Sequence, residues 1–186
     1  SSGLTSIAIP DGVTRLVYDA FYSCSSLTSV TFGPSSQLTR IDNSTFNSSG
    51  LTSIAIPDGV TSIRSSAFYS CSSLTSVTFG SSSQLTNIGS YAFRSATNLT
   101  SIAIPDGVTS IGNSAFDSCS SLTSVTFGSS SQLTTIGTNA FYICSSLTSV
   151  TFGSSSQLTS ISDGAFYLSG LTSIAIPDGV TRIGYD

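Results

Sequence analysis

The stretch LTSIAIPDGVTSIGNSAFDSCSS, residues 99–121, is followed directly by LTSVTFGSSSQLTTIGTNAFYICSS, residues 122–146. Both segments have Leu, Ile or Val, Ala-Phe and Cys in the same order, and the pattern recurs along the chain at intervals of 23 to 25 residues. Each copy opens with Leu-Thr-Ser, at Leu4, Leu27, Leu51, Leu74, Leu99, Leu122, Leu147 and Leu171. A fixed period in this range is typical of a solenoid, in which each copy forms one coil stacked on its neighbours.

The copies are of two kinds. A proline coil contains Pro-Asp-Gly, and a glutamine coil has a longer Gly-to-Gln segment, such as Gly-Ser-Ser-Ser-Gln, at the same place. The order along the chain is proline, glutamine, proline, glutamine, proline, glutamine, glutamine, proline. The two extra residues of the glutamine coil explain most of the variation in period.

Each coil contains the signals of short extended pieces and turns. In the first copy, residues 7–9 (Ile-Ala-Ile) alternate with the period of two expected for a strand. Residues 10–12 (Pro-Asp-Gly) then predict a turn, since proline lacks an N–H and glycine tolerates a positive φ. Val-Thr-x-Ile predicts a second short extended piece, and Ala-Phe-x-x-Cys predicts a tight 3₁₀-like turn.

Only stacking can stabilise such a short repeat. One coil carries about six large apolar side chains, worth roughly 1.5–3 kcal/mol each when buried, which does not offset the ordering of its backbone. In a stack the apolar positions form columns, and eight coils make a rod on the order of 40 Å long. One predicted column consists of Phe21, Phe46, Phe68, Phe93, Phe116, Phe141 and Phe166.

Composition excludes several classes of function. The chain is 8% charged with a net charge of −4, and 69 of its 186 residues are Ser or Thr. All five basic residues are Arg, and they appear scattered along the sequence, which argues against a nucleic-acid partner and against basic membrane contact. No apolar run approaches the roughly 18 residues of a membrane helix, so we expect no membrane insertion.

These elements resemble the BspA-like, Treponema-type leucine-rich repeat. The matching elements are Leu-x-x-Ile-x-Ile-Pro, Val-x-x-Ile, Ala-Phe and the Cys before the next Leu, and they span residues 4–186. The resemblance implies a right-handed, curved leucine-rich-repeat solenoid with a parallel β-sheet on its concave face. It also implies a surface or secreted protein, often an adhesin, without catalytic residues. Ser49, Ala96 and Ser169 depart from the Cys column and soften the core locally.

We expect one solenoid domain over residues 1–186. Residues 171–186 repeat residues 4–19 with only two differences, Leu16/Ile183 and Val17/Gly184, which indicates a larger period of seven coils. From this similarity we hypothesise that the chain is a window of a longer array or a unit that stacks end to end.

The chain lacks the residues of common active sites. A serine nucleophile needs a base, and there is no His or Lys. One column contains four cysteines, Cys24, Cys71, Cys119 and Cys144, but it lacks the CxxC pairs of a structural zinc site. Only Cys119 and Cys144 lie on adjacent coils, close enough for a disulfide. We favour buried thiols over a disulfide. The Asp residues of the Pro-Asp-Gly turns are better explained as turn formers than as calcium ligands. We therefore expect no catalytic residue, cofactor or metal.

The outward positions of the predicted strands are Ser, Thr and Ala. Such a face is small, hydroxylated and uncharged, and it lacks the Trp, Tyr and Arg anchors of ordinary interfaces. It is compatible with weak, multivalent contact to a periodic partner, with the surface of a structural fibre, or, remotely, with binding of ice or another flat surface.

The residue after each core Phe is expected to point outward and to give the most varied surface. That column contains Tyr22, Asn47, Tyr69, Arg94, Asp117, Tyr142 and Tyr167. We predict an Arg94–Asp117 ion pair, a Tyr142–Tyr167 stack and an interaction surface, with ordinary edge covering as the alternative. Separately, Asn43, Asn47 and Asn98 begin Asn-x-Ser/Thr triplets and are candidate glycosylation sites.

Together these observations predict a non-enzymatic extracellular or cell-surface module for adhesion or protein contact. Its expected partners are a host or matrix protein or glycan surface, or further copies of itself end to end. The main alternative is a segment of a polymeric or matrix fibre that carries glycans.

Overall fold

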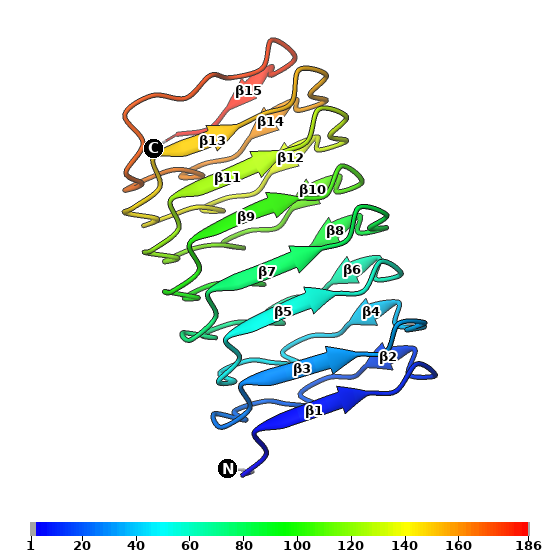
Figure 1. Cartoon of the computed structure of the whole chain (residues 1–186). Helices are drawn as coiled ribbons and strands as arrows, with labels where there is room; N and C mark the ends of the chain where they lie inside the picture. The colour runs from blue at the N-terminus through cyan, green and yellow to red at the C-terminus, as the bar shows by residue number, and fades with distance from the viewer. Residues whose placement is uncertain (1–2, 186) are drawn as a thin grey trace.

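The chain forms a stack of eight coils in a computed structural model that describes residues 3–185 (Figure 1). The regular elements of the described residues are short strands, with no helix among them. The solenoid predicted from the Leu-Thr-Ser period is therefore confirmed. Ser1, Ser2 and Asp186, at the ends of the predicted domain, lie outside the described residues.

The first extended piece is a strand in the first seven coils, and these strands build one face of the stack. Its strands form a four-stranded and a three-stranded parallel sheet, with like residues side by side: Ile7 faces Val30, and Ile54 faces Val77. The strands are β1 (Ser6–Ile9), β3 (Ser29–Phe32), β5 (Ser53–Ile56) and β7 (Ser76–Phe79), followed by β9 (Ser101–Ile104), β11 (Ser124–Phe127) and β13 (Ser149–Thr151).

Strand pairing on this face depends on the kind of coil. A proline coil and the glutamine coil after it pair over four residues, as in β5 with β7. A glutamine coil and the proline coil after it pair poorly: β3 and β5 share one residue pair, Ser29 with Ser53, and β7 and β9 belong to different sheets. Pro57 occupies the same column as Gly80 of the next coil. Glycine has a backbone N–H at this position and proline has none, so the proline coil cannot donate a hydrogen bond here to the coil that precedes it.

The second extended piece forms a continuous eight-stranded parallel sheet, which we call the second sheet. Its order follows the order of the coils, and Ile41 faces Ile63, which faces Ile88. Its strands are β2 (Arg15–Leu16), β4 (Arg40–Ile41), β6 (Ser62–Ile63), β8 (Asn87–Ile88), β10 (Ser110–Ile111), β12 (Thr135–Ile136), β14 (Ser160–Ile161) and β15 (Arg182–Ile183).

The Ala-Phe segment differs from the predicted 3₁₀-like turn. Two residues per coil, two positions before and two after the core Phe, have a positive φ, as at Ser66 (57°) and Ser70 (53°) around Phe68. Alternate N–H groups bond within the coil, Tyr69 to the carbonyl of Ser66, and to the next coil, Phe68 to the carbonyl of Ala92. These turns are linked laterally like strands, which satisfies backbone groups that a 3₁₀ turn leaves unpaired.

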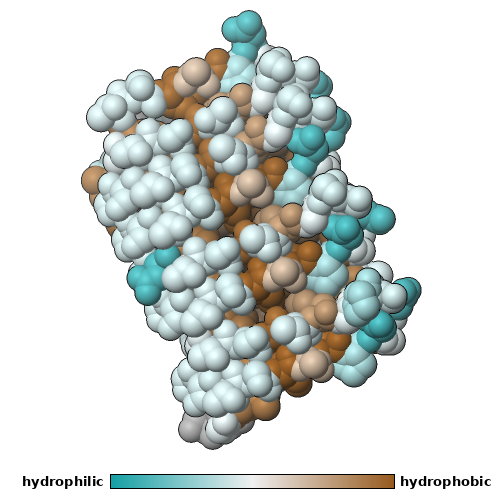
Figure 2. Space-filling model, viewed as in Figure 1, coloured by the Kyte–Doolittle hydropathy of each residue, from teal (hydrophilic) through white to brown (hydrophobic). Residues whose placement is uncertain are grey.

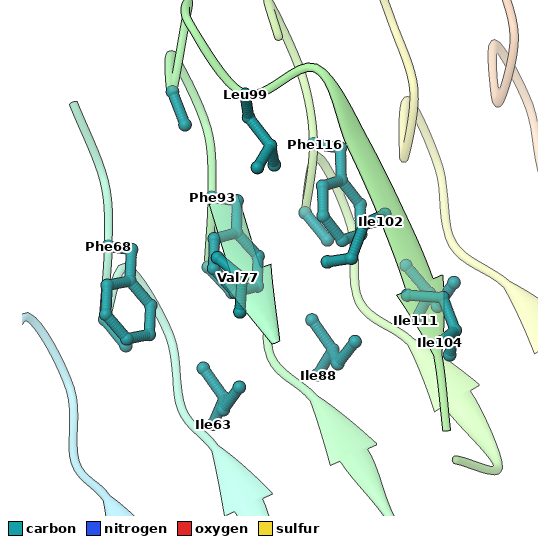
Figure 3. Packing of buried hydrophobic residues seen from close by; sticks show 14 of the residues in the cluster. Ile63, Phe68, Val77, Ile88, Phe93, Leu99, Ile102, Ile104, Ile111 and Phe116 are labelled. Atoms are coloured by element: carbon teal, nitrogen blue, oxygen red, sulfur yellow. The ribbon is translucent and has the colours of Figure 1, made fainter. Parts of the chain in front are cut away.

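The core lies between these three sides and consists of the predicted columns. Phe68, Phe93 and Phe116 stack with their ring centroids 5.1 and 5.2 Å apart (Figure 3). All three are fully buried, and the isoleucines of the second sheet point into the same interior. The predicted phenylalanine column is thus confirmed from Phe21 to Phe166.

Candidate functional site

A row of three hollows follows the carboxyl ends of the first-sheet strands, and we call this row the furrow. Each hollow lies where a glutamine coil is followed by a proline coil, which is where the sheet pairing is lost. The hollow around Pro57 has a volume of about 710 Å³, and those around Pro105 and Pro177 are each about 350 Å³. Figure 2 shows an apolar band, in brown, that runs along the stack between a pale polar area on the left and a more hydrophilic edge on the right.

The three hollows have the same chemistry because the coils have the same sequence. The first is lined by Ala55, Ile56, Pro57 and Phe79, with the carboxylate of Asp58 as the one charged group. The Asp58 carboxylate lies against Gly80 of the next coil, in the space that a Cβ at Gly80 would occupy. Glycine at this position therefore leaves room for the carboxylate at the rim, and no basic residue lines any of the three hollows.

The furrow was not predicted. The Pro-Asp-Gly turn itself is confirmed by the bond from the Val60 N–H to the Pro57 carbonyl, 3.0 Å. The sequence does contain a signal for the furrow, which is the alternation of long and short segments after the strand. A short Pro-Asp-Gly turn that lies between two longer Gly-to-Gln segments leaves a hollow.

The column after the core Phe is partly as predicted. The rings of Tyr142 and Tyr167 stack at 5.7 Å, and Arg94 Nε lies 3.1 Å from Asp117 Oδ2, so both expected pairs form. Asp117 does not point outward, however, because it is buried beneath Arg94 and accepts a bond from the Ser118 hydroxyl at 2.7 Å.

The Arg94 guanidinium lies between two tyrosine rings. It is 5.9 Å from the ring centroid of Tyr69 and 5.7 Å from that of Tyr91. Tyr91 was missed by the sequence analysis because it precedes the core Phe by two positions, in a column that otherwise holds small or polar residues. Tyr22 and Tyr167 are about half exposed, whereas Tyr69 and Tyr142 are partly buried, and the interaction surface stays a prediction.

Three of the five arginines are not scattered, which corrects the expectation from the sequence. Arg15, Arg40 and Arg64 gather around the nearly buried carboxylate of Asp42 on the second sheet. The signal was available in the repeat: Arg15 and Arg40 share one column of the second sheet, and Asp42 and Arg64 share the column two positions later.

The buried cysteines of the cysteine column are reduced thiols. Cys71, Cys119 and Cys144 are free, and their Sγ atoms bond to carbonyl oxygens, Cys71 to that of Phe46 at 3.0 Å. Cys119 and Cys144 stand on adjacent coils without a disulfide, as we favoured. Burial raises the pKa of Cys71 to about 11 and that of Cys144 to about 12. Ser49 takes the place of a cysteine and bonds to Cys71 Sγ at 3.4 Å.

The three candidate glycosylation asparagines lie in different environments. Asn43 and Asn47 are partly buried, and each is followed two positions later by a buried residue, Thr45 and Ser49. Asn98 is exposed, as is Thr100. If the folded protein is modified, we expect Asn98 to be the accessible site.

Comparison with known proteins places this architecture in a class. The family described as "BspA type Leucine rich repeat region (6 copies)" matches residues 1–84 and 81–186. The chain belongs to this family, as the resemblance of its repeat predicted. None of the curated proteins matches the chain in sequence, and residues 3–185 contain no helix able to cross a bilayer.

Several solved structures resemble the fold, including the following two. A leucine-rich repeat protein from Bacteroides ovatus is 28% identical, with a TM-score of 0.62, over 97% of this chain and 57% of that one. The pneumococcal vaccine antigen PcpA is 22% identical, with a TM-score of 0.51, over 97% of this chain and 58% of that one. The chain therefore spans a little under three fifths of the length of these proteins.

Proposed function

We propose that the chain is a non-enzymatic repeat module of an extracellular or cell-surface protein, and that it binds protein partners in adhesion. Membership of the BspA-type family supports this proposal, as does the fold it shares with a protein described as a vaccine antigen. The module acts by presenting a repeated surface rather than by chemistry at one point.

The furrow is the observation that carries the proposal. Its hollows combine an apolar floor with one carboxylate, which suits a lysine or arginine side chain whose aliphatic stem packs on the floor. The hollows around Pro57 and Pro105 are two coils apart, about 10 Å at the usual spacing of strands. Weak contacts at several such hollows add up when the partner presents its basic groups along one line.

A panel of purified host matrix proteins, immobilised for surface plasmon resonance, tests this function. We expect at least one to bind, and the double variant Asp58→Asn, Asp106→Asn to weaken that binding at least tenfold. Asp163→Asn is the matched control, because Asp163 lies outside the furrow and the amide keeps the acceptor oxygen that bonds to the Tyr185 N–H. A panel without any binder, or equal loss in the control, would count against the adhesion proposal.

A second candidate function is a fibre segment that stacks on further copies of the chain. The repeat favours it, because residues 171–186 differ from residues 4–19 at only two positions and therefore offer the same columns for stacking. We expect negative-stain images to show filaments under this alternative and discrete rods under the first. Ile183→Asp should abolish filaments, since it places a charge in the apolar contact.

A further inference from the structure

We propose that Arg15, Arg40 and Arg64 form a binding site for an anionic sugar, one that bears a carboxylate or sulfate group. This site lies on the second sheet, whereas the furrow follows the first. It does not rest on the proposed function, and its failure would leave that proposal standing.

The carboxylate of Asp42 is in close contact with only two of the three guanidinium groups and is hydrogen-bonded to one of them. Arg15 Nη2 donates to Asp42 Oδ2 at 2.7 Å, and Arg40 Nε lies 2.7 Å from Asp42 Oδ1, at an angle that makes no hydrogen bond. Arg64 Nε is 3.7 Å from the same Oδ1, beyond hydrogen-bond reach. No other carboxylate of residues 3–185 forms an ion pair with these arginines, so the cluster carries a local net charge of about +2.

This positive patch is an exception in an acidic protein. The two arginines and eight aspartates outside the cluster carry a net charge of −6. Three unlike coils contribute to the patch, from β2, β4 and β6, which lie side by side at the blue-to-cyan end of the stack (Figure 1). The near-identical coils elsewhere do not repeat it, so it is a single site rather than a periodic surface.

A polar hollow of about 380 Å³ lies beside Arg64. Its lining is Asn43, Ser62, Arg64, Ser65, Asn87 and Gly89. In the column of Arg64 the next coil has Gly89, where a Cβ would meet the backbone of Arg64 and Ser65, so glycine lets the two coils pack closely beside the hollow. About half of the Arg64 side chain is exposed, and its guanidinium makes no hydrogen bond within the described residues. It therefore has donors free for an oxyanion.

The lining favours a sugar over a nucleic acid. Amide and hydroxyl side chains match the hydroxyl groups of a saccharide, and the guanidinium fork matches a carboxylate or sulfate. The hollow has no aromatic ring on which a base could stack. Three guanidiniums within about 10 Å also make a patch too short for the 6–10 phosphate contacts of a typical nucleic-acid site.

Fluorescence anisotropy with labelled dextran sulfate oligosaccharide, at low salt, tests the site on protein made without N-glycosylation, because a glycan on Asn43 would fill the hollow. We expect binding that Arg64→Ser weakens at least tenfold; Ser162 occupies the same column in another coil, so the fold accepts serine there. Ser65→Glu, which adds a carboxylate to the exposed rim, should have the same effect. Both variants should keep the melting temperature of the wild type.

Arg182→Ser is the matched control. Arg182 stands in the column of Arg15 and Arg40 at the far end of the second sheet, so it removes one positive charge outside the site. We expect less than a twofold change. Equal weakening by Arg182→Ser would overturn the site in favour of overall charge. Equally tight binding of unsulfated dextran, of inorganic sulfate alone, or of a thymidine oligonucleotide of the same charge would overturn an anionic sugar as its ligand.

Discussion

At the scale of the residue, the turns around the core Phe impose an unusual backbone. Within residues 3–185, thirteen non-glycine residues have a positive φ, between 53° and 61°. Ten are small polar residues (Ser, Asp or Asn); Asp and Asn tolerate this conformation because their short side chains bond locally, and none of the ten is β-branched. The exceptions are Tyr91, Ile143 and Leu168, and Ile143, with φ of 54°, is the only one of these with a β-branched side chain, which is strained there.

Replacing Ile143 with Asn should stabilise the protein. We expect the free energy of unfolding to rise by about 0.5–1 kcal/mol, because relief of the left-handed strain exceeds the loss of a partly buried side chain. Urea denaturation measures the change. Ser118→Asn, at the equivalent position of the preceding coil, should change stability little, and a loss of stability in Ile143→Asn would contradict the argument.

The buried thiols make stability sensitive to alkaline pH. The ordinary pKa of a thiol is 9.0, and burial raises it to about 11 at Cys71 and about 12 at Cys144. The folded protein therefore holds these protons after the unfolded chain has released them. The contribution of each thiol to the free energy of unfolding is therefore fully present below about pH 9. It falls by about 1.4 kcal/mol per pH unit for each thiol as the pH rises toward 11 and 12.

The triple variant Cys71→Ala, Cys119→Ala, Cys144→Ala should lose this part of the alkaline slope. Alanine fits the column, because Ala96 occupies it fully buried. Urea denaturation between pH 8 and pH 11 compares the two proteins, which differ only at these three positions. An identical slope in the variant would show that the thiols stay protonated in both states or that another group dominates.

At the scale of the element, each coil is stable only through its neighbours. The rings of the phenylalanine column are spaced by 5.1 to 5.4 Å, close to the spacing of strands, so ring stacking and backbone bonding share one period. Alternating bonds within and between coils do the same for the turns that carry these rings.

Phe93→Ala should therefore lower the free energy of unfolding by about 3–5 kcal/mol, since it empties a fully buried site between Phe68 and Phe116. Phe166→Ala is the control, because Phe166 is partly exposed and stacks on one ring, Phe141. Its cost should be smaller in the same urea titration. Equal costs would mean that the column is not the continuous core described above.

At the scale of the whole molecule, the stack is a one-dimensional array in which stability depends on nearest neighbours. The middle coils are covered on both sides, whereas in the first coil Leu4 is 37% exposed and in the last Ile183 is 63% exposed. We expect hydrogen exchange to be slowest for amides of residues 51–146 and faster in the first and last coils. Uniform protection along the chain would indicate all-or-none opening instead.

Much of this protein could be predicted from its sequence. The Leu-Thr-Ser period gave the number of coils, the alternation of Ile-Ala-Ile gave the first strands, and the repeated Phe gave the core column. These predictions succeed because neighbouring coils are almost identical, so that the register placing like residues together is also the one that buries every apolar side chain.

The tertiary structure decided what lies between coils. The furrow depends on the loss of pairing before each proline coil, the burial of Asp117 depends on how Arg94 covers it, and the arginine cluster joins residues up to 49 positions apart around Asp42. A period read along the chain shows which residues share a column. It does not show how far adjacent coils splay or which side chains of neighbouring columns meet, because these are set by backbone hydrogen bonding and packing across the stack.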